Sequence, residues 1–171
     1  MTEELRLKFD SPQALEDFAA DLALFARPGM VLLLQGDLGA GKSTFARAFI
    51  RSLADGDTSF EIPSPTFTLV QTYDETRIPA AHADLYRLRS EQEVDELGFD
   101  DLLKTSVLLV EWPELIMERT CTDRLLVQLE GAGTSRNVTL TPSGAWCQVL
   151  DRNTAIRKFL ATSRWQGATR R

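Results

Sequence analysis

The residue types between Gly36 and Thr44 are those that bind the phosphates of a nucleotide. The segment reads Gly-Asp-Leu-Gly-Ala-Gly-Lys-Ser-Thr and fits the pattern G-x-x-x-x-G-K-[ST] of a P-loop. The glycines allow the backbone to turn so that successive N–H groups point at phosphate oxygens. Lys42 supplies a charge for the β- and γ-phosphates, and the hydroxyl of Ser43 suits Mg²⁺. We expect the nucleotide to contact Asp37, Leu38, Gly39, Ala40, Gly41, Lys42, Ser43 and Thr44.

The flanks of this loop predict the strand and the helix that such a site requires. Residues 30–35 are an apolar run typical of a buried parallel strand. Phe45, Phe49 and Leu53 recur at helical spacing, which predicts a helix that begins at the loop and directs its positive end at the phosphates.

Carboxylates that assist hydrolysis should follow strands beside the P-loop strand. Glu111 follows the apolar run of residues 107–110, and we expect it to act in catalysis. The alternative is an ordinary acid at a strand end. Thr66 follows Pro63 and Pro65. Its hydroxyl would sense the γ-phosphate from a loop, or Thr66 would be an ordinary strand residue without that role. Trp112 would lie beside the nucleotide or, as the default expectation, fill the core.

Asp84 is the second carboxylate candidate. It lies two residues after His82 in an extended segment, so both side chains point to one face. Asp84 would hold a metal-bound water or act as a base, or it would instead pair with Arg87 or Arg89. We interpret His82 as a hydrogen-bonded structural residue.

The remaining patterns predict an α/β fold: a P-loop NTPase with three layers and a mixed parallel and antiparallel central sheet. A serine and a proline begin the first helix, and an antiparallel hairpin follows the P-loop helix. The expected elements are a helix over 12–25, strands over 66–73 and 80–87, a helix over 90–103, strands over 107–110, 125–129 and 138–140, and a helix over 154–160.

Composition narrows the class of protein. The chain has 171 residues, which suits one domain over residues 1–162 and a frayed tail over residues 163–171. The net charge of −6 argues against an autonomous nucleic-acid binder. We expect a cytoplasmic protein without a membrane span, since no apolar run approaches ~20 residues and the two cysteines lie far apart.

The motifs together resemble the TsaE (YjeE) family of bacterial P-loop ATPases. The resemblance is carried by the P-loop, by Ser-Pro-Thr-Phe at 64–67, by His-x-Asp-Leu-Tyr-Arg-Leu at 82–88, and by Glu-Trp-Pro at 111–113. These segments occur in the family order between about residues 10 and 140.

This resemblance implies that the nucleotide is ATP and that Ser43 and Glu111 hold Mg²⁺. It also implies that Lys42 and Asp84 act in hydrolysis and that Arg136 lines the nucleotide. The implied partners are the TsaD and TsaB proteins, which make N6-threonylcarbamoyladenosine at position 37 of tRNA. The ATPase would act on that complex and meet tRNA only through it. Ala14 stands where relatives often have threonine.

The residues alone also allow two other functions of P-loop proteins, a small-molecule kinase and a GTPase. A small-molecule kinase would need an arginine-rich lid, and only scattered arginines such as Arg87, Arg89 and Arg119 are present. A GTPase would use a D-x-x-G segment, and residues 95–98 match it, but they lie within a predicted helix. No N-K-x-D base-reading motif occurs.

Overall fold

The apolar run before the P-loop forms the middle strand of a seven-stranded sheet. We describe a computed structural model that covers residues 4–119, 122–131 and 133–151. The sheet order is β1-β7-β6-β2-β5-β4-β3. The strands are β1 (Leu5–Phe9), β2 (Val31–Gln35), β3 (Val70–Tyr73), β4 (Ala80–Asp84), β5 (Val107–Glu111), β6 (Arg124–Glu130) and β7 (Arg136–Pro142).

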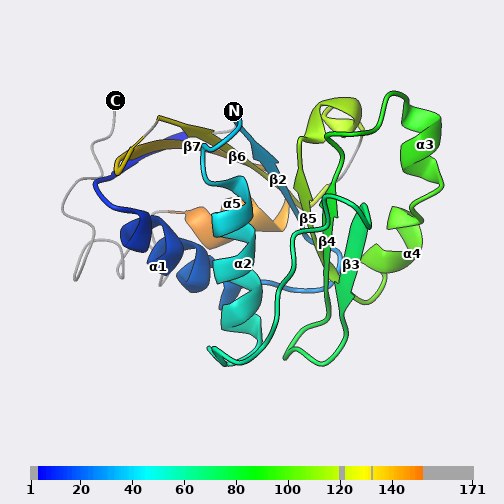
Figure 1. The fold of residues 1–171 in the computed structure, drawn as a ribbon, viewed down its shortest axis with the longest axis horizontal. Helices are drawn as coiled ribbons and strands as arrows, with labels where there is room; N and C mark the ends of the chain where they lie inside the picture. Colours follow the sequence, from blue (N-terminus) through cyan, green and yellow to red (C-terminus); the bar gives the residue numbers. More distant parts are fainter. Residues whose placement is uncertain (1–3, 120–121, 132, 152–171) are drawn as a thin grey trace.

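The sheet is mixed, as predicted. Strand β2 pairs in parallel with β5 and β6, and β4 pairs in parallel with β5. Antiparallel strands flank this parallel centre, with β3 at one edge and β7 followed by β1 at the other. The carboxyl ends of β2, β4 and β5 therefore lie at the same edge, where the P-loop leaves β2 (Figure 1).

Helices cover both faces of the sheet and complete three layers (Figure 1). One face packs against α1, α2 and α5, and the parallel centre packs on its other face against α3, α4 and the 3₁₀ helix η1. The helices are α1 (Pro12–Ala23), α2 (Lys42–Leu53), α3 (Glu91–Asp95), α4 (Phe99–Leu103), η1 (Pro113–Ile116) and α5 (Ala145–Leu150).

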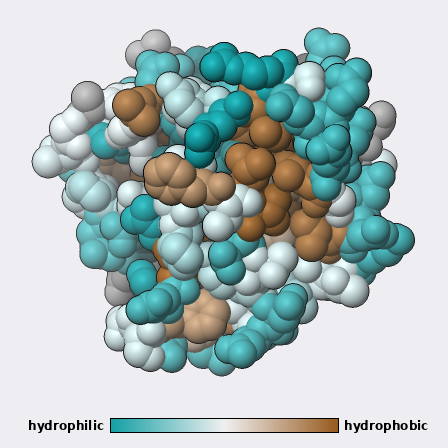
Figure 2. Space-filling model, turned by 45° about the vertical axis from the view of Figure 1, so that its right-hand side comes forward, coloured by the Kyte–Doolittle hydropathy of each residue, from teal (hydrophilic) through white to brown (hydrophobic). Residues whose placement is uncertain are grey.

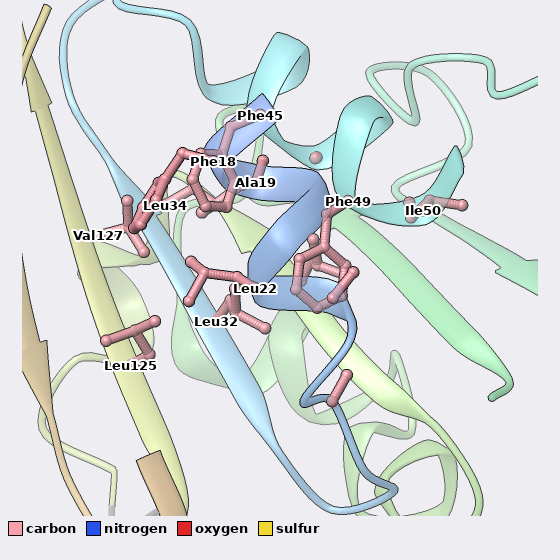
Figure 3. Close-up of a cluster of buried hydrophobic side chains, with 14 of the residues drawn as sticks. Phe18, Ala19, Leu22, Leu32, Leu34, Phe45, Phe49, Ile50, Leu125 and Val127 are labelled. Carbon is pink, nitrogen blue, oxygen red and sulfur yellow. The ribbon is translucent and has the colours of Figure 1, made fainter. Parts of the chain in front are cut away.

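The larger core lies between α1, α2 and the sheet. Phe18 and Leu22 of α1 meet Phe45 and Phe49 of α2 over the apolar residues of β2 and β6 (Figure 3). The rings of Phe18 and Phe45 are 6.4 Å apart in an edge-on arrangement, which aromatic pairs prefer. This packing holds α2, and with it the P-loop, against the ends of the strands.

The second core, beneath α3, α4 and η1, is smaller. Val94, Val110 and Ile116 are buried in it, whereas every apolar residue of α4 keeps some exposure. On the side of the molecule that carries these helices, apolar side chains reach the surface among hydrophilic ones (Figure 2).

Several predicted boundaries differ from the structure. The helix predicted over 90–103 is two helices, because Gly98 adopts φ +70° between them. The strand predicted over 66–73 begins only at Val70, since the amide of Leu69 donates to the carbonyl of Pro65 at 2.7 Å and closes a turn. The hairpin's second strand ends at Asp84.

Two elements were not predicted and two predictions stay untested. Strand β1 and helix α5 carried no expectation from the sequence. The helix predicted over 154–160 and the tail over 163–171 lie outside the described residues. Within the described residues, no helix combines the length and the apolar composition needed to cross a membrane.

The larger core allows a matched test of packing. Leu22 is fully buried, whereas Leu24, two residues later, is 60% exposed. Leu22→Ala should lower the free energy of unfolding by about 2–5 kcal/mol, because it removes buried methyl groups and leaves a cavity. Leu24→Ala should change it by no more than about 0.5 kcal/mol. Denaturant unfolding measures both, and equal effects would contradict the packing described.

Candidate nucleotide-binding site

The P-loop connects β2 to α2 in a conformation that requires glycine at its ends. Gly36 has φ +151°, and a Cβ atom there would clash with the carbonyl oxygen of Leu129. Gly41 has φ +107° and immediately precedes α2. A side chain would clash at Gly36 and would strain the backbone at Gly41, so glycine at both positions lets the loop bring its backbone amides close to a bound anion.

Lys42 is held within the loop rather than extended into solvent. Its side chain is almost fully buried, and Nζ donates to the carbonyls of Gly36 and Asp37 at 2.6 and 2.8 Å. Burial lowers the pKa of Lys42, and the nearby carboxylate of Glu111 opposes that shift. These two hydrogen bonds therefore hold the ammonium group against the loop backbone.

Trp112 covers this ammonium, so the default expectation that it fills the core is wrong. Nζ of Lys42 lies 3.7 Å from the centre of the Trp112 ring, a cation–π contact. The ring also packs against Tyr86 at 4.8 Å. Trp112 has φ +54°, which is uncommon for a bulky residue and is a form of strain found at functional sites.

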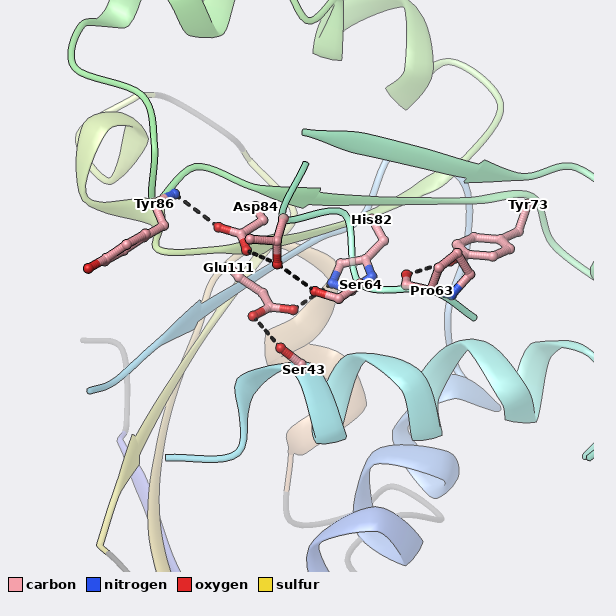
Figure 4. A network of polar contacts seen from close by, with 9 residues as sticks. Ser43, Pro63, Ser64, Tyr73, His82, Asp84, Tyr86 and Glu111 are labelled. Atoms are coloured by element: carbon pink, nitrogen blue, oxygen red, sulfur yellow. Dashed lines mark hydrogen bonds and ion pairs between the residues drawn. The ribbon is translucent and has the colours of Figure 1, made fainter. Parts of the chain in front are cut away.

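Glu111 lies where β5 ends and touches two polar groups. The Ser43 hydroxyl donates to Oε2 at 2.8 Å, and Nε2 of His82 lies 2.7 Å from Oε1 (Figure 4). The carboxylate is 2% exposed. Hydroxyl and carboxylate oxygens are the ligands that Mg²⁺ prefers, so Ser43 and Glu111 fit the metal that the P-loop pattern implies.

Asp84 lies beside Glu111 but makes different contacts. The two residues are register partners on β4 and β5, so their side chains point to the same face. Asp84 accepts from the Tyr86 amide at 3.0 Å and from the Thr66 hydroxyl at 3.3 Å. Within the described ranges no ion pair joins Asp84 to an arginine, and its carboxylate accepts hydrogen bonds from Tyr86 and Thr66 instead.

The turn that carries Thr66 is joined to the site by hydroxyl groups. Ser64 Oγ and Thr66 Oγ1 are 2.9 Å apart, and the Thr66 hydroxyl in turn donates to Asp84. Thr66 belongs to this turn and not to β3. Of the two alternatives for Thr66, the structure therefore favours the hydroxyl on a loop over the strand residue.

Arg136, at the start of β7, contacts the backbone of the P-loop. Its Nε donates to the carbonyl of Ala40 at 2.7 Å and a terminal nitrogen to that of Gly39 at 3.1 Å. The other terminal nitrogen donates to the carbonyls of Gly133 and Ser135 at 2.8 Å. The guanidinium thus joins the loop to the β6–β7 hairpin.

A cavity of about 400 Å³ opens beside the loop. Its lining includes Gly36, Asp37 and Trp112, together with the amide side chains of Gln35 and Gln128, which bond to each other at 3.1 Å. The sequence offered no signal for Gln35 or Gln128, since each is an ordinary strand residue. For His82 the signal was its spacing from Asp84.

Comparison with known proteins places these features in a family. The model of the family described as "Threonylcarbamoyl adenosine biosynthesis protein TsaE" matches residues 9–138. A relative from Bacillus subtilis, named tRNA threonylcarbamoyladenosine biosynthesis protein TsaE, is 38% identical over 159 residues, which cover 90% of this chain and 98% of the relative. A protein of the same name from Rickettsia conorii is 38% identical over 129 residues, covering 75% of this chain and 73% of that protein.

A solved structure agrees with the sequence comparison. The crystal structure of YdiB from Bacillus subtilis superposes with a TM-score of 0.69 at 34% sequence identity, covering 88% of this chain and 93% of that one. The likeness therefore extends over the sheet and the helices as well as the loop, and the chain belongs to the TsaE family of P-loop proteins.

Proposed function

We propose that this protein is a Mg²⁺-dependent ATPase that supports N6-threonylcarbamoyladenosine formation at position 37 of tRNA by acting on the TsaD–TsaB complex. The observation that carries the hydrolytic part is the buried contact between Ser43 and Glu111 beside Lys42. The names of the relatives support the pathway.

The phosphates would lie over the P-loop amides, with the loop residues 37–44 around them. Lys42 would neutralise the β- and γ-phosphates, because its ammonium is held at the loop by the carbonyls of Gly36 and Asp37. Ser43 and Glu111 would hold Mg²⁺, which when bound neutralises charge that develops on the phosphates. Arg136 would act on nucleotide binding by fixing the shape of the loop.

Asp84 and Thr66 would act on the γ-phosphate side. The Tyr86 amide orients one oxygen of Asp84, which leaves the carboxylate able to accept a hydrogen bond from the attacking water. Thr66 would contact the γ-phosphate, and its hydrogen bond to Asp84 would link the position of that carboxylate to the presence of the phosphate. We expect slow turnover by the protein alone, because Arg136 directs its donors at carbonyls and not at the phosphates.

Exposed apolar side chains around the site support a protein partner. Leu38 in the loop, Phe67 beside Thr66 and Tyr86 beside Trp112 are 87%, 85% and 61% exposed. Large apolar groups gathered at the rim of a site are typical of interaction surfaces. We propose that TsaD and TsaB dock there, and that tRNA is reached only through them.

The central test is ATP hydrolysis with and without purified TsaB–TsaD. We expect the complex to raise turnover at least about tenfold, a lowering of the barrier by about 1.4 kcal/mol. Lys42→Ala should abolish the activity in both conditions. Unchanged turnover on adding the complex would contradict the proposed partner, whereas transfer of phosphate to a metabolite would favour a small-molecule kinase.

A second test concerns the metal. Glu111→Ala should reduce Mg²⁺-dependent turnover by roughly a hundredfold or more, because it removes a charged oxygen ligand, about 2.7 kcal/mol of barrier. Glu96→Ala is the matched control, since Glu96 is an exposed carboxylate at the end of α3 and does not line the cavity beside the loop. Steady-state hydrolysis over a Mg²⁺ series measures both, and full activity of Glu111→Ala would exclude Glu111 as the ligand.

A third test concerns the loop. Arg136→Lys keeps the charge but not the planar fork that reaches four carbonyl oxygens, so ADP affinity should fall roughly tenfold. Arg6→Lys, on an exposed side chain of β1, should leave it unchanged. Calorimetric titration with ADP measures both, and equal affinities would show that the loop does not need the guanidinium.

A further inference from the structure

His82 is a large, fully buried polar residue on a strand of otherwise small inner residues. Strand β4 reads Ala-Ala-His-Ala-Asp, and all five residues are buried. Ala80 precedes His82 on the same face, so the imidazole occupies space that its neighbours leave free. A side chain that only filled this space could be apolar, which would avoid the free-energy cost of burying ring nitrogens.

The polar contact that His82 makes is with Glu111. Nε2 lies 2.7 Å from Oε1, while Nδ1 has no hydrogen-bond partner among the described residues. Mg²⁺ binds the ionised form of a carboxylate, which only accepts hydrogen bonds, so in the metal-binding form Nε2 is the donor of this contact. The contact is made in a site where Glu111 is 2% exposed, so water cannot readily replace His82 as the partner.

This contact also determines how the carboxylate is turned. With Oε1 bonded to His82, the second oxygen faces the start of α2 and receives the Ser43 hydroxyl at 2.8 Å. A carboxylate free to rotate about its last bond would present that oxygen only part of the time. Partners behind a metal ligand commonly fix its orientation in this way.

We propose that His82 is a positioning residue that holds Glu111 in the orientation needed to bind Mg²⁺ together with Ser43. This inference rests on the proposed function, since it concerns the same metal site. His82 contacts neither nucleotide nor metal and acts through Glu111. Because His82 and Ser43 both belong to the protein, their contacts can hold the carboxylate in this orientation without help from the metal.

The test compares three variants of His82 in the full chain. Glutamine has as many bonds between Cβ and its amide nitrogen as histidine has to Nε2, so His82→Gln can still donate to Oε1. His82→Asn carries its amide one bond closer to the backbone and cannot reach. His82→Leu removes the donor and keeps similar bulk.

Calorimetric titration of Mg²⁺ into the ADP complex is the readout, with ADP affinity in EDTA and the unfolding temperature measured alongside. His82→Leu and His82→Asn should weaken Mg²⁺ binding about ten- to a hundredfold, the usual effect of removing such a partner. His82→Gln should stay within about threefold of wild type. ADP affinity in EDTA should change less than about twofold in all three.

The outcomes separate this inference from the proposed function. If wild type binds Mg²⁺ with ADP and folded His82→Leu does so equally well, the positioning role is wrong while the metal site stands. Equal losses in folded His82→Gln and His82→Asn would also overturn it, and that pair decides the question if His82→Leu does not fold. If ADP binding by wild type shows no Mg²⁺ dependence, the proposed metal site and this inference both fail.

Discussion

The parallel pairing of β5 with β2 on one side and β4 on the other is the constraint on which the site depends. It places Leu34 opposite Glu111 and Glu111 opposite Asp84, so the P-loop begins beside two carboxylates. A shift of either register by one residue would turn an acid to the other face of the sheet. The position of the acids is thus set by backbone hydrogen bonds and by the apolar residues that occupy both faces of these strands.

Buried charge is concentrated at this edge of the sheet. Of the buried polar or charged residues described, Lys42, His82, Asp84 and Glu111 surround the loop, and only Thr76 and Ser106 lie elsewhere. Removing charged groups from water is costly unless they are paired. Here each one is paired, the lysine with carbonyls and each acid with at least one donor. The free-energy cost of burying these groups falls at the site where the proposed chemistry needs them, which is usual at functional sites.

The sequence predicted the parts of the fold whose signals are local. The P-loop, its apolar strand and its helix follow from residue types within about twenty positions, and Glu111 follows from the four apolar residues before it. Strand β1 was missed because Arg6 and Lys8 interrupt its apolar residues, unlike the continuous apolar runs of β2 and β5, and because its partner β7 lies far along the chain. The position of Trp112 was missed because a positive φ in a bulky residue is imposed by tertiary contacts. The contact between His82 and Glu111 required the register of β4 and β5, which the sequence does not state.

The bond from Arg136 to the P-loop has a consequence for the order of folding. The loop ends at residue 44, yet β2 pairs with strands that begin at residues 107 and 124, and the arginine that fixes the loop backbone follows still later. Long-range contacts of this kind form late, because bringing distant segments together has an entropic cost. During synthesis the residues of the loop are therefore made long before the residues that fix the loop's conformation. The phosphate site can take its final shape only after Arg136 has been made, well after the loop itself.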